Sequence, residues 1–235
     1  MNIIITGASK GLGKAIAEIF ADDNQSHTFF LCARNKEVLE ITGKELQHRF
    51  PRINMYTKVC DVSDKESMQE FVSWIFGLTK KIDILVNNAG IFLPGSVHNE
   101  QDGVLEKMMD VYLYGTYHLT RLLLPKMMQV KSGHIFNICS IAALQAYNNG
   151  GTYSISEFAK YGFSKNLREE MKPYGIKVTH ILPGAAYTDS WSGSGIDPKR
   201  IMEAADIAKM IYAAAHLSPQ ACVEEIIMRP QLGDI

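Results

Sequence analysis

Short apolar runs alternate along the whole chain with longer stretches whose apolar positions recur at helical spacing. The short runs predict strands at Asn2–Ile5, Thr28–Ala33, Ile53–Cys60, Ile82–Val86, His134–Ile138, Ile176–Leu182 and Val223–Met228. These strands are too continuously apolar to have a face in water, which is typical of a parallel sheet covered on both sides. The pattern therefore predicts an α/β fold built on seven parallel strands.

The stretches between the strands predict helices. The first predicted helix follows Gly13. The other predicted helices span Lys36–Phe50, Asp64–Leu78, Gly103–Met128, Gly151–Met171 and Glu203–Ala215. One stretch, Tyr187–Arg200, has little periodicity and much glycine. Because it follows the carboxyl end of a strand, it is either a substrate lid or an exposed loop.

Composition narrows the class of protein. The 235 residues fit one α/β domain, so we expect 1–235 to be a single domain. A net charge of −1 offers no field for nucleic acid or anionic lipid, and we expect neither partner. No apolar stretch reaches the ~20 residues that cross a bilayer, and the first strand starts at once. We expect a cytoplasmic protein with reduced cysteines.

A glycine-rich segment, Thr6 to Gly13, links the first strand to the first helix. Gly7, Gly11 and Gly13 permit a tight turn and a close approach of backbone amides to a phosphate, which the positive end of the helix also favours. Glycines collect in turns for steric reasons as well, but a strand, a glycine loop, a helix and a second strand in succession favour a nucleotide-phosphate site.

Metal chemistry is not expected. The seven histidines show no His-x-x-x-His spacing, and the four cysteines form no Cys-x-x-Cys pair.

Further local motifs follow the glycine loop in a fixed order. They are Asp61-Val62, Asn87-Asn88-Ala89-Gly90, Ser140, Tyr153-Ser154-Ile155-Ser156-Glu157 and Pro183-Gly184. Each taken alone fits an ordinary turn or helix cap. In this order they resemble the short-chain dehydrogenase/reductase family over the whole chain. The resemblance implies a single Rossmann-type, doubly wound NADP(H)-binding reductase domain.

The same resemblance implies a set of cofactor-binding residues. The glycine loop would surround the pyrophosphate, Asp61 and Val62 would meet the adenine, and Thr188 would contact the nicotinamide carboxamide. The complete expected set is Gly7, Ser9, Lys10, Gly11, Leu12, Gly13, Arg34, Asp61, Val62, Asn88, Ala89, Gly90, Pro183, Gly184 and Thr188.

The choice of cofactor depends on the end of the second strand. An acid there would bind a ribose 2′-hydroxyl, whereas a cation neutralises a 2′-phosphate. The strand ends in Cys32-Ala33-Arg34, and Lys10 in the glycine loop offers a second charge. We predict NADP(H); the alternative is that both cations are merely solvated.

The catalytic motif matches the family at two positions and departs at two. Tyr153 matches the general acid and Ser140 the group that binds the carbonyl oxygen. Glu157 stands at the lysine position and Tyr112 at the asparagine position. A neighbouring anion disfavours tyrosinate, so Glu157 should raise the pKa of Tyr153. Lys160 lies about 10 Å beyond Tyr153 along the helix, so we expect it to pair with Glu157 rather than replace the lysine.

The predicted function is NADP(H)-dependent reduction of a carbonyl by hydride transfer. Glu157 would slow it while still accepting hydrogen bonds from the ribose. The alternative is a catalytically silent NADP(H)-binding sensor or partner subunit.

The segments Pro183–Thr188 with Trp191, and Val223–Ile235, look most like those of bacterial sepiapterin reductases. This resemblance suggests a small-molecule substrate such as a pterin side-chain dicarbonyl, with Trp191 stacking on a ring and Asp234 receiving ring N–H groups. The alternatives are a lid anchor and a solvated acid.

Family members assemble as dimers or tetramers through two long helices, so we also expect a homodimer or homotetramer. Its contacts would include Met108, Met109, Tyr112, Tyr114 and Tyr117, unless these residues are core.

Overall fold

One parallel sheet organises the chain. The computed structural model describes residues 1–188, 191, 193 and 195–235. Seven strands pair in the order β3-β2-β1-β4-β5-β6-β9, each parallel to its neighbours. Their bounds are β1 Asn2–Thr6, β2 Thr28–Ala33, β3 Asn54–Val59, β4 Ile84–Asn87, β5 Gly133–Ile138, β6 Ile176–Pro183 and β9 Glu225–Met228. The predicted doubly wound α/β sheet is confirmed, and its order reverses between β1 and β4, where a ligand crevice is expected.

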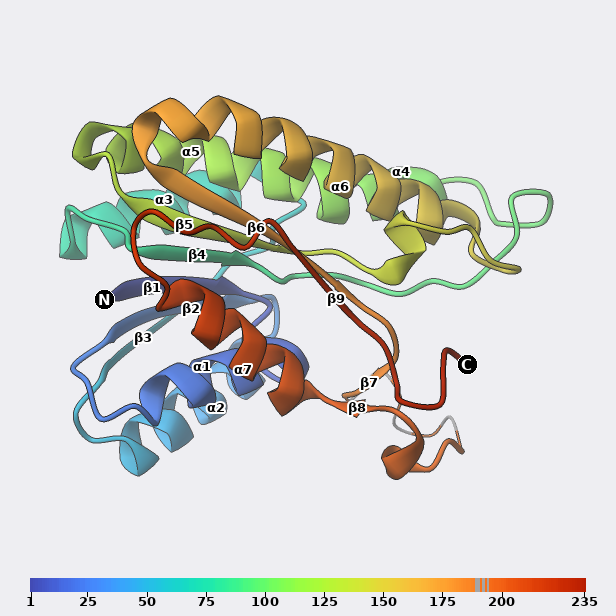
Figure 1. The fold of residues 1–235 in the computed structure, drawn as a ribbon, viewed down its shortest axis with the longest axis horizontal. Helices are drawn as coiled ribbons and strands as arrows, with labels where there is room; N and C mark the ends of the chain where they lie inside the picture. The colour runs from blue at the N-terminus through green and yellow to red at the C-terminus, as the bar shows by residue number, and fades with distance from the viewer. Residues whose placement is uncertain (189–190, 192, 194) are drawn as a thin grey trace.

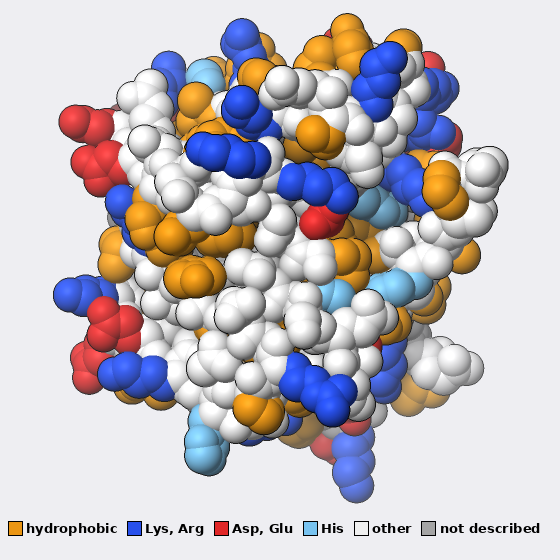
Figure 2. All heavy atoms as spheres, turned by 90° about the vertical axis from the view of Figure 1, so that its left-hand side faces the viewer, with side chains coloured by type: hydrophobic (Ala, Val, Ile, Leu, Met, Phe, Trp, Pro, Cys, Tyr) orange, Lys and Arg blue, Asp and Glu red, His pale blue; other side chains and the backbone are white. Residues whose placement is uncertain are grey.

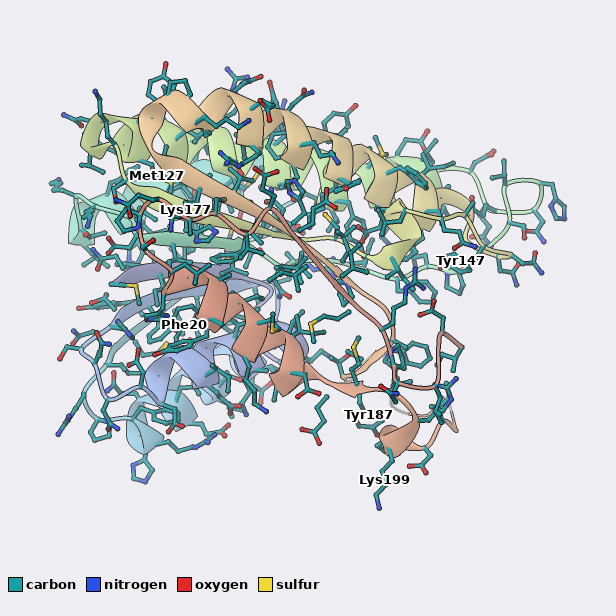
Figure 3. All side chains as sticks on the ribbon, viewed as in Figure 1. Phe20, Met127, Tyr147, Lys177, Tyr187 and Lys199 are labelled. Carbon is teal, nitrogen blue, oxygen red and sulfur yellow. The ribbon has the colours of Figure 1, made fainter. Side chains whose placement is uncertain are left out.

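Helices cover both faces of this sheet (Figure 1). They are α1 Gly11–Ala21, α2 Lys36–Arg49 and α7 Ala204–Ala215 on one face, and α3 Lys65–Leu78, α4 Val104–Met109, α5 Thr116–Val130 and α6 Gly151–Met171 on the other. Phe20 of α1 packs edge-on against Tyr212 of α7, with ring centroids 5.1 Å apart. Met127 of α5 lies in the opposite layer (Figure 3). Each face of the sheet thus has its own apolar core.

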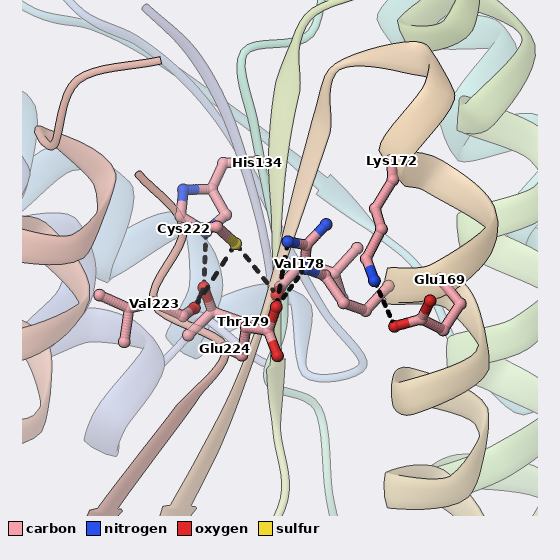
Figure 4. Close-up of polar contacts among 9 residues, drawn as sticks. His134, Glu169, Lys172, Val178, Thr179, Cys222, Val223 and Glu224 are labelled. Carbon is pink, nitrogen blue, oxygen red and sulfur yellow. Dashed lines mark hydrogen bonds and ion pairs between the residues drawn. The ribbon is translucent and has the colours of Figure 1, made fainter. Parts of the chain in front are cut away.

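Side-chain bonds fasten the last strand to the sheet at its amino end. The Thr179 hydroxyl donates to the Val223 carbonyl at 2.5 Å, and the same oxygen lies 2.7 Å from Nε2 of His134 (Figure 4). Burial lowers the pKa of His134 to about 3, so its ring is neutral. The edge strand β9 is therefore anchored by a buried polar group as well as by the β6 ladder.

The predicted helix Gly103–Met128 is instead three segments. A π-helical turn, η1 (Asp110–Gly115), separates α4 from α5. Such insertions widen a helix and often occur at functional sites. η1 carries Tyr112, whose ring the wider turn places against α6.

The stretch Tyr187–Arg200 begins in a small second sheet. β7 (Ala186–Tyr187) pairs in parallel with β8 (Met202–Glu203), which the sequence did not predict. A 3-10 turn, η5 (Pro198–Arg200), precedes β8. Residues 189, 190, 192 and 194 lie outside the described residues, so the choice between lid and loop stays open.

The surface at the amino end of the strands carries both basic and acidic side chains among apolar ones (Figure 2). Among the described helices, none combines the length and apolar character needed to span a bilayer.

Candidate active site

A cavity of about 1340 Å³ opens at the carboxyl edge of the sheet. Its wall includes nearly all of the predicted site residues: Gly7, Ser9, Lys10, Gly11, Leu12, Arg34, Asp61, Val62, Asn88, Ala89, Gly90, Tyr112, Ser140, Tyr153, Pro183, Gly184, Thr188, Trp191 and Asp234. Two predicted residues, Gly13 and Glu157, are not part of the wall as described. Tyr147 and Tyr187 extend from the two halves of the molecule that flank this edge (Figure 3).

The glycine loop is braced by the turn that follows β4. Gly7 has a φ of +64°, and a Cβ there would lie 2.9 Å from the Ala89 Cα. The Asn88 side-chain amide donates to the carbonyls of Thr6 at 2.8 Å and Gly7 at 3.1 Å. The Thr6 hydroxyl in turn accepts from the Asn88 and Ala89 amides at 3.0 and 2.9 Å. These bonds fix the loop backbone before any ligand arrives.

Gly13 serves this loop from behind the cavity. A Cβ at this position would lie 2.5 Å from the Gly7 carbonyl oxygen and 2.7 Å from Asn88 Nδ2. We predicted that Gly13 contacts the pyrophosphate. In the structure its small size instead lets α1 pack closely against the glycine loop.

The ends of β2 and β3 supply the next part of the wall. Arg34 and Lys10 are both exposed at the cavity. Asp61 follows β3, and its Oδ1 accepts from the Ser63 amide at 2.9 Å and the Ser63 hydroxyl at 2.7 Å. Asp61 is thus held in a fixed turn beside the buried Val62.

The segment after β6 lies across the glycine loop. A Cβ at Gly11 would be 3.4 Å from Thr188 Cβ, so Thr188 lies directly against the start of α1. The Trp191 amide donates to the Thr188 carbonyl at 2.9 Å.

Asp234 enters the same cavity from the C-terminal segment. Its carboxylate is already paired with Arg229. Arg200 donates to the carbonyls of Gly233 at 3.0 Å and of Leu232 and Asp234 at 3.3 Å. Asp234 is exposed as well as paired, so any ring N–H would share its carboxylate with Arg229.

Ser140 and Tyr153 lie side by side in the wall. Ser140 caps the 3-10 turn η2 (Ile141–Ala143), and its Oγ accepts from the Ala142 amide at 3.1 Å. Hydrogen bonding with Ser140 lowers the pKa of Tyr153, but burial and then Glu157 raise that pKa well above its ordinary value. The sequence predicted the effect of Glu157, whereas burial is the larger cause. The phenol is protonated, as an acid must be.

Tyr112 stands edge-on to Tyr153, with ring centroids 5.7 Å apart and planes at 71°. Its hydroxyl donates to the Ile91 carbonyl at 2.5 Å, and its side chain is buried. Met108, one turn earlier, is also buried, whereas Tyr114 is exposed. The expectation that Met108 and Tyr112 form an oligomer contact is therefore wrong, because both are core.

Glu157 lies behind Tyr153, not in the cavity. It is 1% exposed, and its Oε2 has no hydrogen-bond partner. Burial raises the pKa of Glu157 to about 7, against the lowering effects of the Lys160 charge and of hydrogen bonding with Tyr153. Glu157 is thus not part of the described cavity wall, where we expected it to accept hydrogen bonds from a ribose.

Lys160 is completely buried next to this carboxylate. Its Nζ donates to the Asn87 carbonyl at 3.2 Å and lies 5.5 Å from the centre of the Tyr112 ring. Burial lowers the pKa of Lys160, and the Cys139 and Glu157 charges oppose that effect. Among the described residues, no ion pair within 4 Å joins Lys160 to Glu157. The predicted pairing is therefore a longer-range attraction, and the direct partner is a carbonyl that sequence reasoning missed.

The distance argument for Lys160 overlooked the direction of its side chain. Helical side chains lean toward the helix N-terminus, so a long lysine recovers much of the rise that separates it from Tyr153. Elsewhere in the described chain, no three His, Cys, Asp or Glu side chains gather as metal ligands would.

Comparison with known proteins places this cavity in context. Residues 1–197 match the short chain dehydrogenase family. The chain belongs to this family. A sepiapterin reductase of Chlorobaculum tepidum is 32% identical over 237 residues, which cover 99% of this chain and 97% of that protein. An uncharacterized oxidoreductase of Staphylococcus saprophyticus is 34% identical over 233 residues, covering 97% and 96%.

Solved structures of the family share the fold. A metagenomic short-chain oxidoreductase in complex with NADP aligns with a TM-score of 0.84 and 27% identity, covering 98% of this chain and 97% of that one. L-Sorbose reductase from Gluconobacter frateurii, complexed with NADPH and L-sorbose, aligns with a TM-score of 0.88 and 25% identity, covering 97% and 94%. The predicted family and Rossmann-type fold are confirmed.

Proposed function

We propose that this chain is an NADP(H)-dependent reductase of small carbonyl compounds. The observation that carries the proposal is one cavity whose wall holds a braced glycine loop, an exposed arginine after β2, and the Ser140 and Tyr153 side chains. The first two features suit a dinucleotide phosphate, and the last two suit a carbonyl oxygen.

The cavity suits NADP(H) by its donors and its shape. Positions 7 and 13 leave no room for a side chain, so backbone amides remain open to a pyrophosphate at the start of α1. Arg34 and Lys10 supply positive charge for a 2′-phosphate. NADP complexes among the solved relatives support this choice.

The protein groups then orient and protonate the substrate. When bound, NADPH supplies the hydride. Ser140 accepts from the Ala142 amide and lies beside Tyr153, so its hydroxyl can turn from the phenol to a carbonyl oxygen. The Tyr153 phenol, protonated over the physiological pH range, donates its proton to the same oxygen as the alcohol forms. Phe92 packs edge-on against Tyr153, with ring centroids 5.1 Å apart.

For the substrate, we favour a vicinal dicarbonyl on a flat ring or a small dicarbonyl. The 32% identical sepiapterin reductase supports this class. Trp191 in the wall offers a stacking surface, and Asp234 with Arg229 offers a polar end.

The test is carbonyl-dependent NADPH oxidation with sepiapterin and 2,3-butanedione. We expect Tyr153→Phe and Ser140→Ala to lower kcat by about 10²–10⁴-fold while NADPH still binds. An exposed matched control, Tyr114→Phe, should retain activity. Turnover that survives both substitutions would overturn the assignment.

The second candidate is a silent NADP(H)-binding protein. The observation in its favour is that Tyr112 and a sealed Glu157 stand where the family has asparagine and lysine. NADPH binding without turnover of any dicarbonyl would support it.

A further inference from the structure

Two buried ionisable groups, an acid and a base, lie behind the candidate acid Tyr153. Glu157 follows it by one helical turn on α6 and is buried. Lys160 is one further turn along α6 and is completely buried. Buried ionisable groups without water are costly, so such a pair persists only where surrounding groups hold it.

A chain of hydrogen bonds fixes the ammonium. The Asn87 carbonyl accepts from Lys160, and the Asn87 amide donates to Asn137 Oδ1 at 2.8 Å. Asn137 donates to the Ser164 hydroxyl at 2.7 Å, which lies 2.5 Å from His180 Nδ1. These residues come from β4, β5, α6 and β6. The position of the Lys160 charge is thus set by the sheet itself.

Glu157 lies behind two rings that line the cavity, among the residues that the structure describes. The Tyr112 and Tyr153 rings face the cavity, and neither Glu157 nor Lys160 is among its described wall residues. Oε2 of Glu157 is buried without a partner, which a carboxylate tolerates poorly and a protonated acid tolerates better.

We propose that Glu157 is the proton donor that reloads Tyr153, and that Lys160 is a positioning residue that stabilises the carboxylate left behind. The proposal rests on the proposed reductase function. It gives Glu157, which stands at the family's lysine position, a role that needs no contact with a ribose.

The step balances as follows. NADPH gives a hydride to the carbonyl carbon and becomes NADP⁺, and the Tyr153 O–H bond breaks as the proton moves to the carbonyl oxygen. The Glu157 O–H bond breaks in turn and its proton moves to the Tyr153 oxygen. Glu157 is left ionised facing Lys160. One proton from solvent, passed through Tyr153, restores Glu157 before the next turnover.

Several other ionisable groups lie on the elements that pack around Glu157. They are Tyr153 and Lys160 on α6, Tyr112 on η1, Cys139 after β5, Tyr147 before α6 and His180 on β6. Burial raises the pKa of the three phenols and of the thiol, and lowers that of His180 to about 4. Glu100 contacts the first turn of α6, where it accepts from the Thr152 amide at 2.9 Å.

The experiment is a pH profile of kcat for 2,3-butanedione reduction. For the unmodified chain, kcat should fall as pH rises through about 7, where Glu157 loses its proton. Glu157→Gln should lack this fall and be about tenfold slower at low pH. Lys160→Met should move the midpoint upward by about one pH unit or more, because a nearby opposite charge is lost.

Lys165→Met, on the exposed side of α6, is the matched control and should leave the profile unchanged. A purely structural effect of Lys160→Met would lower kcat without moving the midpoint. An unmoved midpoint, or the same fall in Glu157→Gln, would overturn the proposal.

An infrared carboxyl titration of the unmodified protein keeps the two proposals separable. A protonated carboxyl band that disappears through about pH 7, and is missing in Glu157→Gln, supports the ionisation on which the relay depends. If that band titrates but no dicarbonyl is reduced, the proposed reductase function is wrong, whereas the ionisation of Glu157 beside Lys160 is supported. If turnover occurs without the band, the relay fails and the reductase function stands.

Discussion

Glu157→Gln tests whether a buried acid destabilises this fold at neutral pH. Burial raises the pKa of Glu157 from 4.5 to about 7. Between these values the folded chain holds a proton that the unfolded chain has lost. The contribution of Glu157 to stability is therefore full below about pH 4.5 and is lost as pH rises through about 7. At about 1.4 kcal/mol per pH unit, the loss is about 3 kcal/mol.

The assay is urea unfolding of both proteins without cofactor, from about pH 5 to about pH 8. Gln has the shape of the protonated acid but does not titrate, so the stability difference should move by about 3 kcal/mol in favour of the variant. Glu169→Gln, at an exposed position of α6, is the control. Lys172 lowers the pKa of Glu169, so it should show no change in this direction. A difference that stays constant with pH would refute the reasoning.

Three further variants test the charges around the cavity and in the core. Glu157→Lys puts a second ammonium beside Lys160. Its NADPH turnover and its melting temperature should therefore both lie below those of the double variant Glu157→Lys/Lys160→Met. The reverse order would contradict an electrostatic coupling between positions 157 and 160. Arg34→Asp should weaken NADPH relative to NADH by about 10–100-fold in a fluorescence titration, and unchanged selectivity would remove the 2′-phosphate assignment. Burial lowers the pKa of His180 to about 4, so its stabilising contribution is full above pH 6.5 and is lost as pH falls toward 4. His180→Gln should therefore lose less stability in acid melts, and equal acid sensitivity would argue against a neutral buried ring.

The sheet and the loops at its carboxyl edge were predictable because their signals are local. A run such as Thr28–Ala33 is apolar at every buried position, and the structure has the same bounds. Gly7 and Arg34 lie at strand ends, so the parallel topology alone brings them to one edge. Because these motifs follow strands rather than precede them, the cavity was predictable at the carboxyl edge of the sheet.

The features that sequence reasoning missed depend on contacts between distant elements. The π turn at Asp110–Gly115 interrupts a stretch whose helical periodicity continues unchanged, so nothing local marks it. Lys160 bonds to the Asn87 carbonyl, 73 positions away in the sequence, only when α6 has packed against the sheet. The lean of helical side chains was the one available signal for the reach of Lys160.

The short pairing of β7 with β8 brings the two ends of one chain segment together. Ala186 pairs with Met202 and Tyr187 with Glu203, so the chain between them leaves and returns at one point. Doubling the length of such a closed segment costs only about 0.6 kcal/mol. The length of this segment can therefore change while the sheet and the glycine loop, which lie outside it, stay the same. Directed libraries for new carbonyl substrates should begin there.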